Sequence, residues 1–354
     1  MNILERYITY RIIQEDAETI FSILKSERNP IFNMEIIPYY ALFIQSCREL
    51  NGILDEKDFG KRIKDIRNFI KIYSEGYGKT QKRILAVNEK QDVQYKSQLR
   101  CKFVKKVDSY YNMGTYWTDD RHVIGNTQML ADFLEIDNIF DENQNKMQYE
   151  LAKQIASFIS SLRNSLSDNM QIPIISRPSQ NIDIRYYYDL NINKGDLLFK
   201  TGSSTTLNIF LLNLLCNMNF VRCVLRPLVD KYNLWVLRIE YNVTYYTYKS
   251  LVRLKNYDES NNNDFFLENI ADLDINTEKI FSTKFRNCMM HYGLENEKII
   301  VPDNIKKPFY GIVESCYEGK DFYDFVEELR KVSNKVIKIL ELNINSDEVI
   351  LERL

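Results

Sequence analysis

The sequence predicts an all-α protein in which an N-terminal helical domain is followed by an antiparallel helical bundle. Two observations support this fold class. Glycine and proline are sparse, with 11 and 7 among 354 residues, and few turn-forming residues favour long helices over many short strands. Apolar residues also recur at three- and four-residue intervals over long stretches, the period of an amphipathic helix. Because the chain exceeds one ordinary core, we expect two domains, 1–189 and 190–354.

In the first domain, four stretches carry a helical pattern. They cover residues 2–26, 34–50, 58–73 and about 143–166. The third is the clearest, because Phe59, Ile63 and Ile66 fall on one helical face. Asn51-Gly52 after the second stretch is a helix stop signal. The tract from Asp108 to Gln128 is aromatic and polar without periodicity, which predicts a loop.

The domain boundary is predicted in the irregular, proline-containing stretch 170–189. Residues 189–200, around Asn193-Lys194-Gly195, fit a short β-hairpin. Four helical patterns follow, from Ser204 or Thr205 to about 225, then 228–257, 277–292 and 322–342. The segment Lys200-Thr201-Gly202-Ser203-Ser204-Thr205 superficially resembles a phosphate-binding loop but lacks the GxxxxGK[ST] order. We expect its small polar residues to cap the next helix.

Composition indicates a soluble, cytoplasmic protein without a membrane partner. The N-terminus lacks the features of a signal peptide. The apolar stretch 207–225 is interrupted by Asn213, Asn217, Asn219 and Arg222, so it falls short of the roughly 18 to 20 uninterrupted apolar residues of a span. Six scattered cysteines include no CxxC pair, which indicates reduced thiols and no zinc site. We therefore expect no metal and no cofactor.

The residues that suggest chemistry lie around one of the only two histidines. His291 closes the run Arg286-Asn287-x-x-x-His291 late in a predicted helix. Helical geometry puts Asn287 and His291 on one face, with Arg286 beside them. Gly293-Leu294 fits a Schellman motif with Gly293 as the left-handed residue, which places His291 in the last turn. The negative end of the helix dipole favours the protonated imidazole of His291, whereas the positive charge of Arg286 disfavours it.

These side-chain types fit metal-independent RNA cleavage. A ribose 2′-hydroxyl can attack the adjacent phosphate if a base such as His291 takes its proton and a cation stabilises the phosphorane. The planar guanidinium of Arg286 suits the phosphate oxygens, and Asn287 can orient the phosphate or the histidine. The products would be a 2′,3′-cyclic phosphate and a 5′-hydroxyl.

Arg286-Asn287-x-x-x-His291 on a late helix of an α-bundle resembles the signature of the HEPN superfamily. The resemblance covers roughly residues 200–342. It implies that Arg286 and His291 are catalytic and that Asn287 supports them in an endoribonuclease of a toxin–antitoxin or antiphage system. It also implies a homodimer formed through the bundle, and an antitoxin or other regulator as a possible partner. One toxin subgroup carries a modifiable tyrosine two residues after the histidine; Gly293 stands there, so that regulation is not supported.

Two alternatives remain open at this level. The bundle can be a catalytically inactive HEPN-like scaffold that dimerises or docks a partner, with Arg286 and His291 buried in pairs within the chain. Residues Arg163-Asn164-x-x-x-Asp168 repeat the skeleton of the motif with aspartate in place of histidine. They represent either a degenerate second bundle or, as we favour, an ordinary exposed helix end.

A basic segment, residues 61–106, suggests contact with RNA. It contains fourteen Lys and Arg residues and four Asp and Glu residues, an excess of ten positive charges. Because the whole chain has a net charge of −2, the residues outside this segment carry a net charge of −12. Interleaved tyrosines at 73, 77 and 95 are typical of surfaces that hold phosphates and stack bases; a solvated helix face is the alternative. The candidate RNA-binding residues are Lys61, Arg62, Arg67, Lys82, Arg83, Arg100, Lys102 and Lys105.

The other histidine, His122, follows Asp119, Asp120 and Arg121. Two carboxylates and an imidazole are metal-ligand types, but side chains of adjacent residues rarely converge on one ion. We therefore predict that His122 lies in a surface loop.

Overall fold

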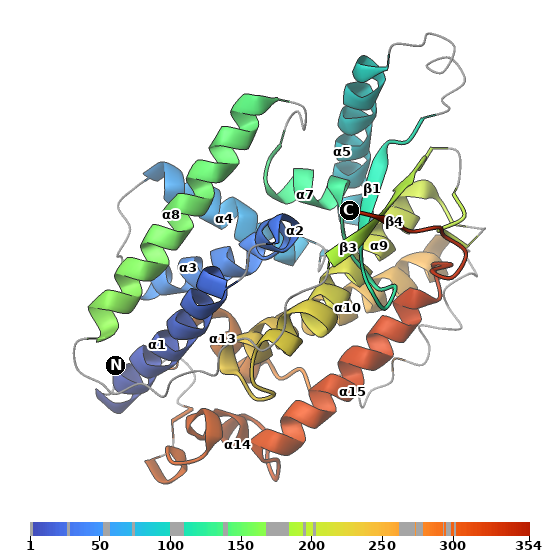
Figure 1. Cartoon of the computed structure of the whole chain (residues 1–354). Helices are drawn as coiled ribbons and strands as arrows, with labels where there is room; N and C mark the ends of the chain where they lie inside the picture. Colours follow the sequence, from blue (N-terminus) through green and yellow to red (C-terminus); the bar gives the residue numbers. More distant parts are fainter. Residues whose placement is uncertain are drawn as a thin grey trace.

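The protein is mostly helical, as predicted, but it also contains a four-stranded antiparallel sheet that an all-α fold lacks (Figure 1). The structure is a computed structural model. It describes residues 3–26, 29–51, 57–72, 75–99, 110–136, 141–167, 184–193, 196–200, 203–261, 273, 279–292, 294, 299–300 and 302–354. The predicted boundary stretch 170–189 therefore lies mostly outside the described residues.

The N-terminal half forms a layer of helices. Those at residues 3–26, 37–51, 57–72 and 142–167 lie close to the predicted ranges, whereas those at 77–98 and 127–133 were not predicted. In the first helix Ile8, Ile12, Ile20 and Ile23 face the core. Asn29 caps the short second helix, because its side chain accepts from the N–H of Ile31 and Phe32. These helices are α1 (Ile3–Ser26), α2 (Pro30–Glu35), α3 (Ile37–Asn51), α4 (Lys57–Ile72), α5 (Tyr77–Gln98), α7 (Thr127–Phe133) and α8 (Glu142–Ser167).

The predicted loop 108–128 is wrong, because it contains two strands. The sheet order is β2-β1-β3-β4, from β1 (Met113–Thr118), β2 (Val123–Asn126), β3 (Ile184–Leu190) and β4 (Glu352–Arg353). Thr115 pairs with Tyr188, and Tyr186 with Arg353. Both β1 and β2 are buried on nearly every residue, so they lack the polar–apolar alternation that identifies a half-exposed strand.

The predicted hairpin over 189–200 does not form. Asp189 pairs with Gly114 of β1, and Phe199 forms an isolated bridge with Ile344. Each half of the expected hairpin is thus bonded to a distant segment rather than to the other half; Lys194 and Gly195 lie outside the described residues.

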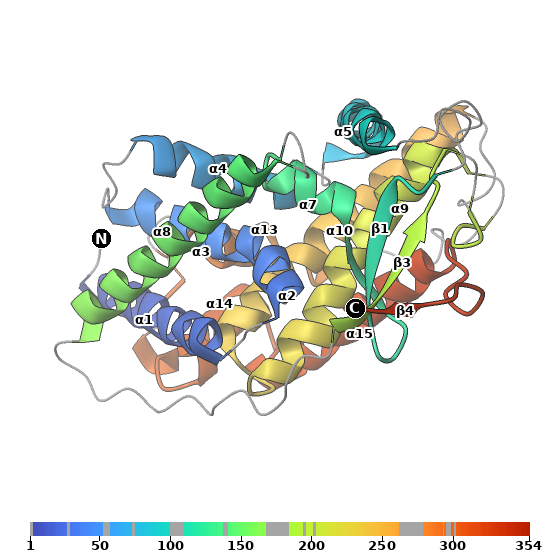
Figure 2. The ribbon, with the colours of Figure 1, turned by 45° about the horizontal axis from the view of Figure 1, so that its top comes forward.

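The C-terminal half contains two long helices and a short one that carries the histidine motif. Figure 2 shows α10 running through the middle of the molecule, and it contacts α1, α9, α13 and α15. Ser204 caps the apolar helix as predicted. The elements are α9 (Thr205–Asn219), η2 (Phe220–Leu225), η3 (Arg226–Leu228), α10 (Leu234–Asn261), α13 (Thr283–His291), η5 (Pro302–Asn304), η6 (Pro308–Gly311), α14 (Ile312–Cys316) and α15 (Phe322–Glu341).

Buried side chains from both halves form one hydrophobic cluster. Phe220 stacks on Tyr39, and Trp235 on Tyr40, across the expected boundary. By length and composition Thr205–Leu228 could cross a membrane, but 83% of its most apolar window is buried in the fold. Such burial is typical of a core helix of a soluble protein. None of the five cysteines that the structure describes is in a disulfide, and three of these are buried.

Candidate functional site

The motif lies on α13, a helix whose two faces have different environments. Ser282 caps its start by accepting from the N–H of Phe285 at 3.0 Å. On the inner face, the Phe285 ring packs 4.7 Å from Phe325 and 5.0 Å from Tyr241. Cys288, Met289 and Met290 are buried beside it. The packed inner face fixes the helix rotation, so that Arg286, Asn287 and His291 are left partly exposed.

The helix ends one residue earlier than the Schellman pattern predicts. Tyr292 itself adopts the left-handed conformation, with φ 51°, whereas Gly293 lies outside the described residues. A left-handed residue other than glycine costs roughly 1 to 2 kcal/mol. Burial of the Tyr292 ring offsets this cost, because it packs edge-on against Phe43 and lies 4.1 Å from the Arg238 guanidinium. His291 occupies the last turn, as predicted.

Side chains from three other helices cap the carbonyls at the end of α13. Unpaired C-terminal carbonyls of a helix need such partners when they are buried. The donors come from α1, α3 and α10, and therefore attach the motif helix to both halves of the protein. They are Arg238 to Cys288 and Met289 (2.7 and 3.1 Å), Asn242 to Met289 (3.2 Å), Ser46 to Met290 (2.5 Å) and Thr9 to Tyr292 (3.3 Å).

Behind these caps lies a fully buried charged group formed by Asp16, Arg238 and Tyr292. Arg238 Nε donates to Asp16 Oδ2 at 3.1 Å, and the Tyr292 hydroxyl donates to the same oxygen. Burial raises the pKa of Asp16 to about 6, although Arg238 and Tyr292 oppose the shift. Asp16 Oδ1 has no hydrogen-bond partner among the described residues. The sequence did not reveal this group, because Asp16 lies more than 200 residues before both Arg238 and Tyr292.

Arg286 folds over its neighbour on the exposed face. Its Nη2 and Nε donate to Asn287 Oδ1 at 2.7 and 3.3 Å, and its guanidinium lies 5.8 Å from the ring centroid of Tyr245. Since Asn287 and His291 are four residues apart, they share one side of the helix. The guanidinium is therefore held one turn before the imidazole.

His291 pairs with Glu49 of α3, a residue that the motif does not include. Nδ1 of His291 lies 2.9 Å from Glu49 Oε2, and both side chains remain accessible, with exposed fractions of 44% and 39%. Burial would raise the pKa of Glu49, but hydrogen bonds from His291 and Gln45 and the charges of His291 and Arg67 outweigh it and lower that pKa. A carboxylate only accepts, so Nδ1 carries the proton and Nε2 of a neutral imidazole keeps its lone pair.

The basic segment contributes one residue to these surroundings. Arg67 of α4 is half-buried, acts electrostatically on Glu49 and Tyr246, and has no hydrogen-bond partner for its Nε among the described residues. Lys61 and Lys82 are exposed.

Other parts of the basic segment are engaged within the fold. Arg62 donates to Met147 O and to Gln148. The Nε of Arg83 donates to both carboxylate oxygens of Asp132. Tyr77 is buried between Phe210 and Tyr257, so it cannot stack on bases. Tyr73, Arg100, Lys102 and Lys105 lie outside the described residues.

The second copy of the motif is partly described. Arg163 Nε donates to Glu18 at 2.7 Å, and its guanidinium packs 4.5 Å from the Phe21 ring centroid. Asn164 is exposed at the end of α8, and Asp168 lies outside the described residues. The arginine thus anchors α8 to α1.

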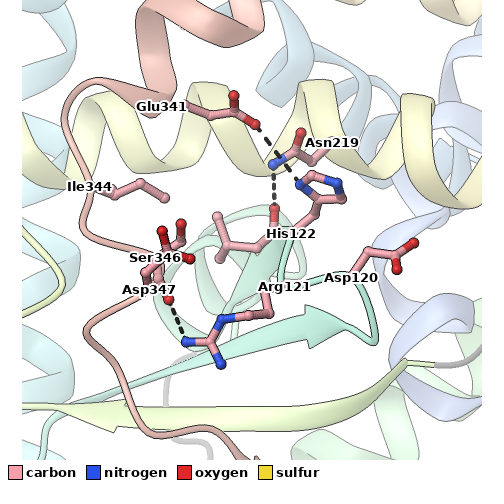
Figure 3. A pocket seen from close by; sticks show the side chains of 9 residues that line it. Asp120, Arg121, His122, Asn219, Glu341, Ile344, Ser346 and Asp347 are labelled. Carbon is pink, nitrogen blue, oxygen red and sulfur yellow. Dashed lines mark hydrogen bonds and ion pairs between the residues drawn. The ribbon is translucent and has the colours of Figure 1, made fainter.

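His122 lies in the loop between β1 and β2, as predicted, and its side chain is 35% exposed. It lies half-buried at the β1–β2 turn, in a pocket of about 310 Å³ that also includes Asp120, Asn219 and Glu341 (Figure 3). Arg222 bridges the group, with its Nη2 3.2 Å from His122 Nδ1, 3.0 Å from Asn219 and 3.3 Å from Glu341. Burial and Arg222 lower the pKa of His122, although Glu341 and Asp120 oppose the shift.

The sequence did not reveal the partners of His122, because they come from distant parts of the chain. Arg222 belongs to the π-helical turn η2, a form often found at functional sites. Arg121, which precedes His122 in the chain, has a left-handed φ of 59°. Its guanidinium donates to Ser346 O and Val349 O of the C-terminal segment.

Among the described residues, no group of three or more His, Cys, Asp or Glu side chains is arranged to hold a metal ion. Comparison with known proteins gave no match to any family model, to any curated protein or to any solved structure.

Proposed function

We propose that the protein is a metal-independent endoribonuclease of the HEPN type, with Arg286, Asn287 and His291 as its catalytic residues. The observation that carries the proposal is the shared face of α13, where an accessible imidazole follows one turn after a guanidinium held by Asn287. A base and a cation at this separation can act on one ribose phosphate.

In this mechanism His291 acts through Nε2. The lone pair of Nε2 accepts the proton of the 2′-hydroxyl as its oxygen attacks the adjacent phosphorus. The P–O5′ bond breaks, and the leaving 5′-oxygen takes a proton from solvent water. The proton on His291 then returns to solvent, which restores the base. Arg286 stabilises the charge on the phosphorane oxygens. Glu49 holds the imidazole through Nδ1 and stabilises the imidazolium, which makes it a positioning residue.

The scaffold alternative requires the side chains of Arg286 and His291 to be buried in pairs within the chain. Arg286 pairs with its own neighbour, and the His291–Glu49 pair is accessible, which favours the enzyme. The HEPN resemblance adds a homodimer in which two motifs face each other, a role in toxin–antitoxin or antiphage defence, and a cytoplasmic location.

The test is incubation of purified protein with mixed RNA in EDTA, followed by analysis of the product ends. We expect 2′,3′-cyclic phosphates from the wild type and none from Arg286→Ala or His291→Ala. His122→Ala serves as the matched control and should retain cleavage. Cleavage that survives in both motif variants would refute the assignment. A folded dimer that leaves every RNA intact would favour the scaffold function.

A further inference from the structure

A second cavity, of about 630 Å³, lies between β3 and the start of α9. Both views place these elements on the sheet side of the molecule, away from α13 (Figures 1 and 2). Its volume is within the range of about 300 to 1,000 Å³ that is typical of small-molecule sites. The lining residues used below are Tyr111, Tyr188, Asp196, Lys200, Ser203 and Asn208.

One wall of the cavity is aromatic. Tyr111 is 64% exposed although it is a large ring, and Tyr188 is half-buried on β3 with its hydroxyl donating to Asp196 at 2.7 Å. Phe199 contributes a buried ring. An accessible tyrosine beside a second aromatic ring is a surface on which a planar base can stack.

Another part of the lining is suited to an anion. It contains the first turn of α9, where Ser204 caps Leu207 and the N–H groups of Thr205 and Thr206 have no partner within the helix. Lys200 also lines the cavity. A helix N-terminus with a nearby lysine attracts phosphate.

Two polar atoms of the lining side chains lack partners among the described residues. Asn208 is more than nine-tenths buried, and its Oδ1 accepts no hydrogen bond; the Oγ of Ser203 is likewise unpaired. A buried polar atom without a partner is costly, and a bound ligand with hydrogen-bond donors would relieve that cost. Asp196 is a further acceptor, whose Oδ1 also receives the N–H of Leu198 at 3.0 Å.

We propose that this cavity binds one nucleotide, with its base stacked on Tyr111 and its phosphate at the N-terminus of α9. Asn208 and Asp196 then accept from the donor groups of the base or ribose. The nucleotide is either free or one unit of an RNA strand. Binding at this site does not depend on cleavage at α13.

Calorimetric titration of the full chain in EDTA tests the proposal. The probes are the four ribonucleoside 5′-monophosphates, adenosine, inorganic phosphate and a 5′-phosphorylated tetranucleotide. A mononucleotide lacks the phosphodiester that the proposed nuclease would cut, so failure of one proposal is distinguishable from failure of the other. We expect at least one mononucleotide to bind more tightly than adenosine or phosphate alone.

Tyr111→Ala should weaken nucleotide binding roughly 5- to 150-fold, the loss of one base-stacking contact. Lys200→Gln should weaken the mononucleotide more than it weakens adenosine. Tyr149→Ala is the matched control, because Tyr149 is equally exposed, at 63%, but lies on α8. Loss of exposed Tyr111 should leave the unfolding midpoint unchanged.

The outcomes separate the possible sources. Binding of the mononucleotides identifies a free nucleotide, whereas binding of the tetranucleotide alone, still dependent on Tyr111, identifies RNA. Phosphate that binds as tightly as every nucleotide would overturn base recognition. The proposal also fails if no probe binds, or if Tyr111→Ala and Tyr149→Ala behave alike.

Discussion

Glu49 and His291 form a hydrogen-bonded pair although 242 positions separate them in the chain. Nδ1 of the imidazole lies 2.9 Å from the Glu49 carboxylate, which also accepts from Gln45 at 3.1 Å. The pair joins α3 of the N-terminal half to the end of α13. The carboxylate thereby fixes the orientation of the imidazole and leaves its second nitrogen available.

The first prediction concerns this pair. Glu49→Gln removes the charge that fixes the imidazole, so we expect kcat for RNA cleavage to fall roughly 10- to 100-fold, part of the 10²- to 10⁴-fold that a positioned general base contributes. KM should stay unchanged. Steady-state kinetics on a defined RNA measures both. Glu150→Gln, which removes an exposed glutamate on α8, should have no effect. A change in KM alone would point to substrate binding instead.

The second prediction concerns the buried pair behind the motif helix. Arg238→Met leaves Asp16 without its counter-charge and removes two of the hydrogen bonds that cap α13, so the free energy of unfolding should fall by about 3 to 5 kcal/mol. Urea titration followed by circular dichroism measures it. Lys231→Met breaks an exposed pair with Glu327 and should leave the midpoint unchanged. Similar midpoints for the two variants would show that the buried pair does not anchor α13.

The third prediction concerns pH. Burial raises the pKa of Asp16 from its ordinary 3.8 to about 6, so between these values the folded state binds this proton more tightly than the unfolded chain. Stability relative to Asp16→Asn should therefore fall as pH rises through that window and level off above it. Parallel urea titrations from pH 4 to 7 test this. A difference that increases with pH would mean that Arg238 and Tyr292 outweigh burial.

The fourth prediction concerns His122. Burial and Arg222 lower its pKa below the ordinary 6.5, so its protonation opposes folding as pH falls. Proton NMR can follow the Hε1 signals, because the chain has only two histidines and His291→Gln assigns them. Arg222→Gln should raise the pKa of His122. If the signal titrates at or above 6.5 in the wild type, His122 is not in the environment described.

Several helices were predictable because their signals are local. The ranges of α1, α8, α9 and α15 follow from apolar periodicity and from capping residues such as Ser204. The face shared by Asn287 and His291 also follows from helical spacing alone. These features depend on residues within a few positions of one another, so the order of residues is sufficient to predict them.

The strands and the partners of the site were decided by contacts between distant segments. Strands β1 and β2 are covered on both faces and show no alternation, so nothing local distinguishes them from a loop. Tyr292, rather than glycine, adopts the left-handed conformation because Arg238, Asp16 and Phe43 pack around its ring.

The sequence by itself determined which chemistry is present: an arginine, an asparagine and one of two histidines at helical spacing. Only the tertiary structure decided what surrounds them. Glu49 reaches His291, Arg238 caps α13, and Arg222 encloses His122 because helices far apart in the chain pack together to bury their apolar faces. The free energy of that packing comes from the whole core, and a local sequence pattern does not encode it.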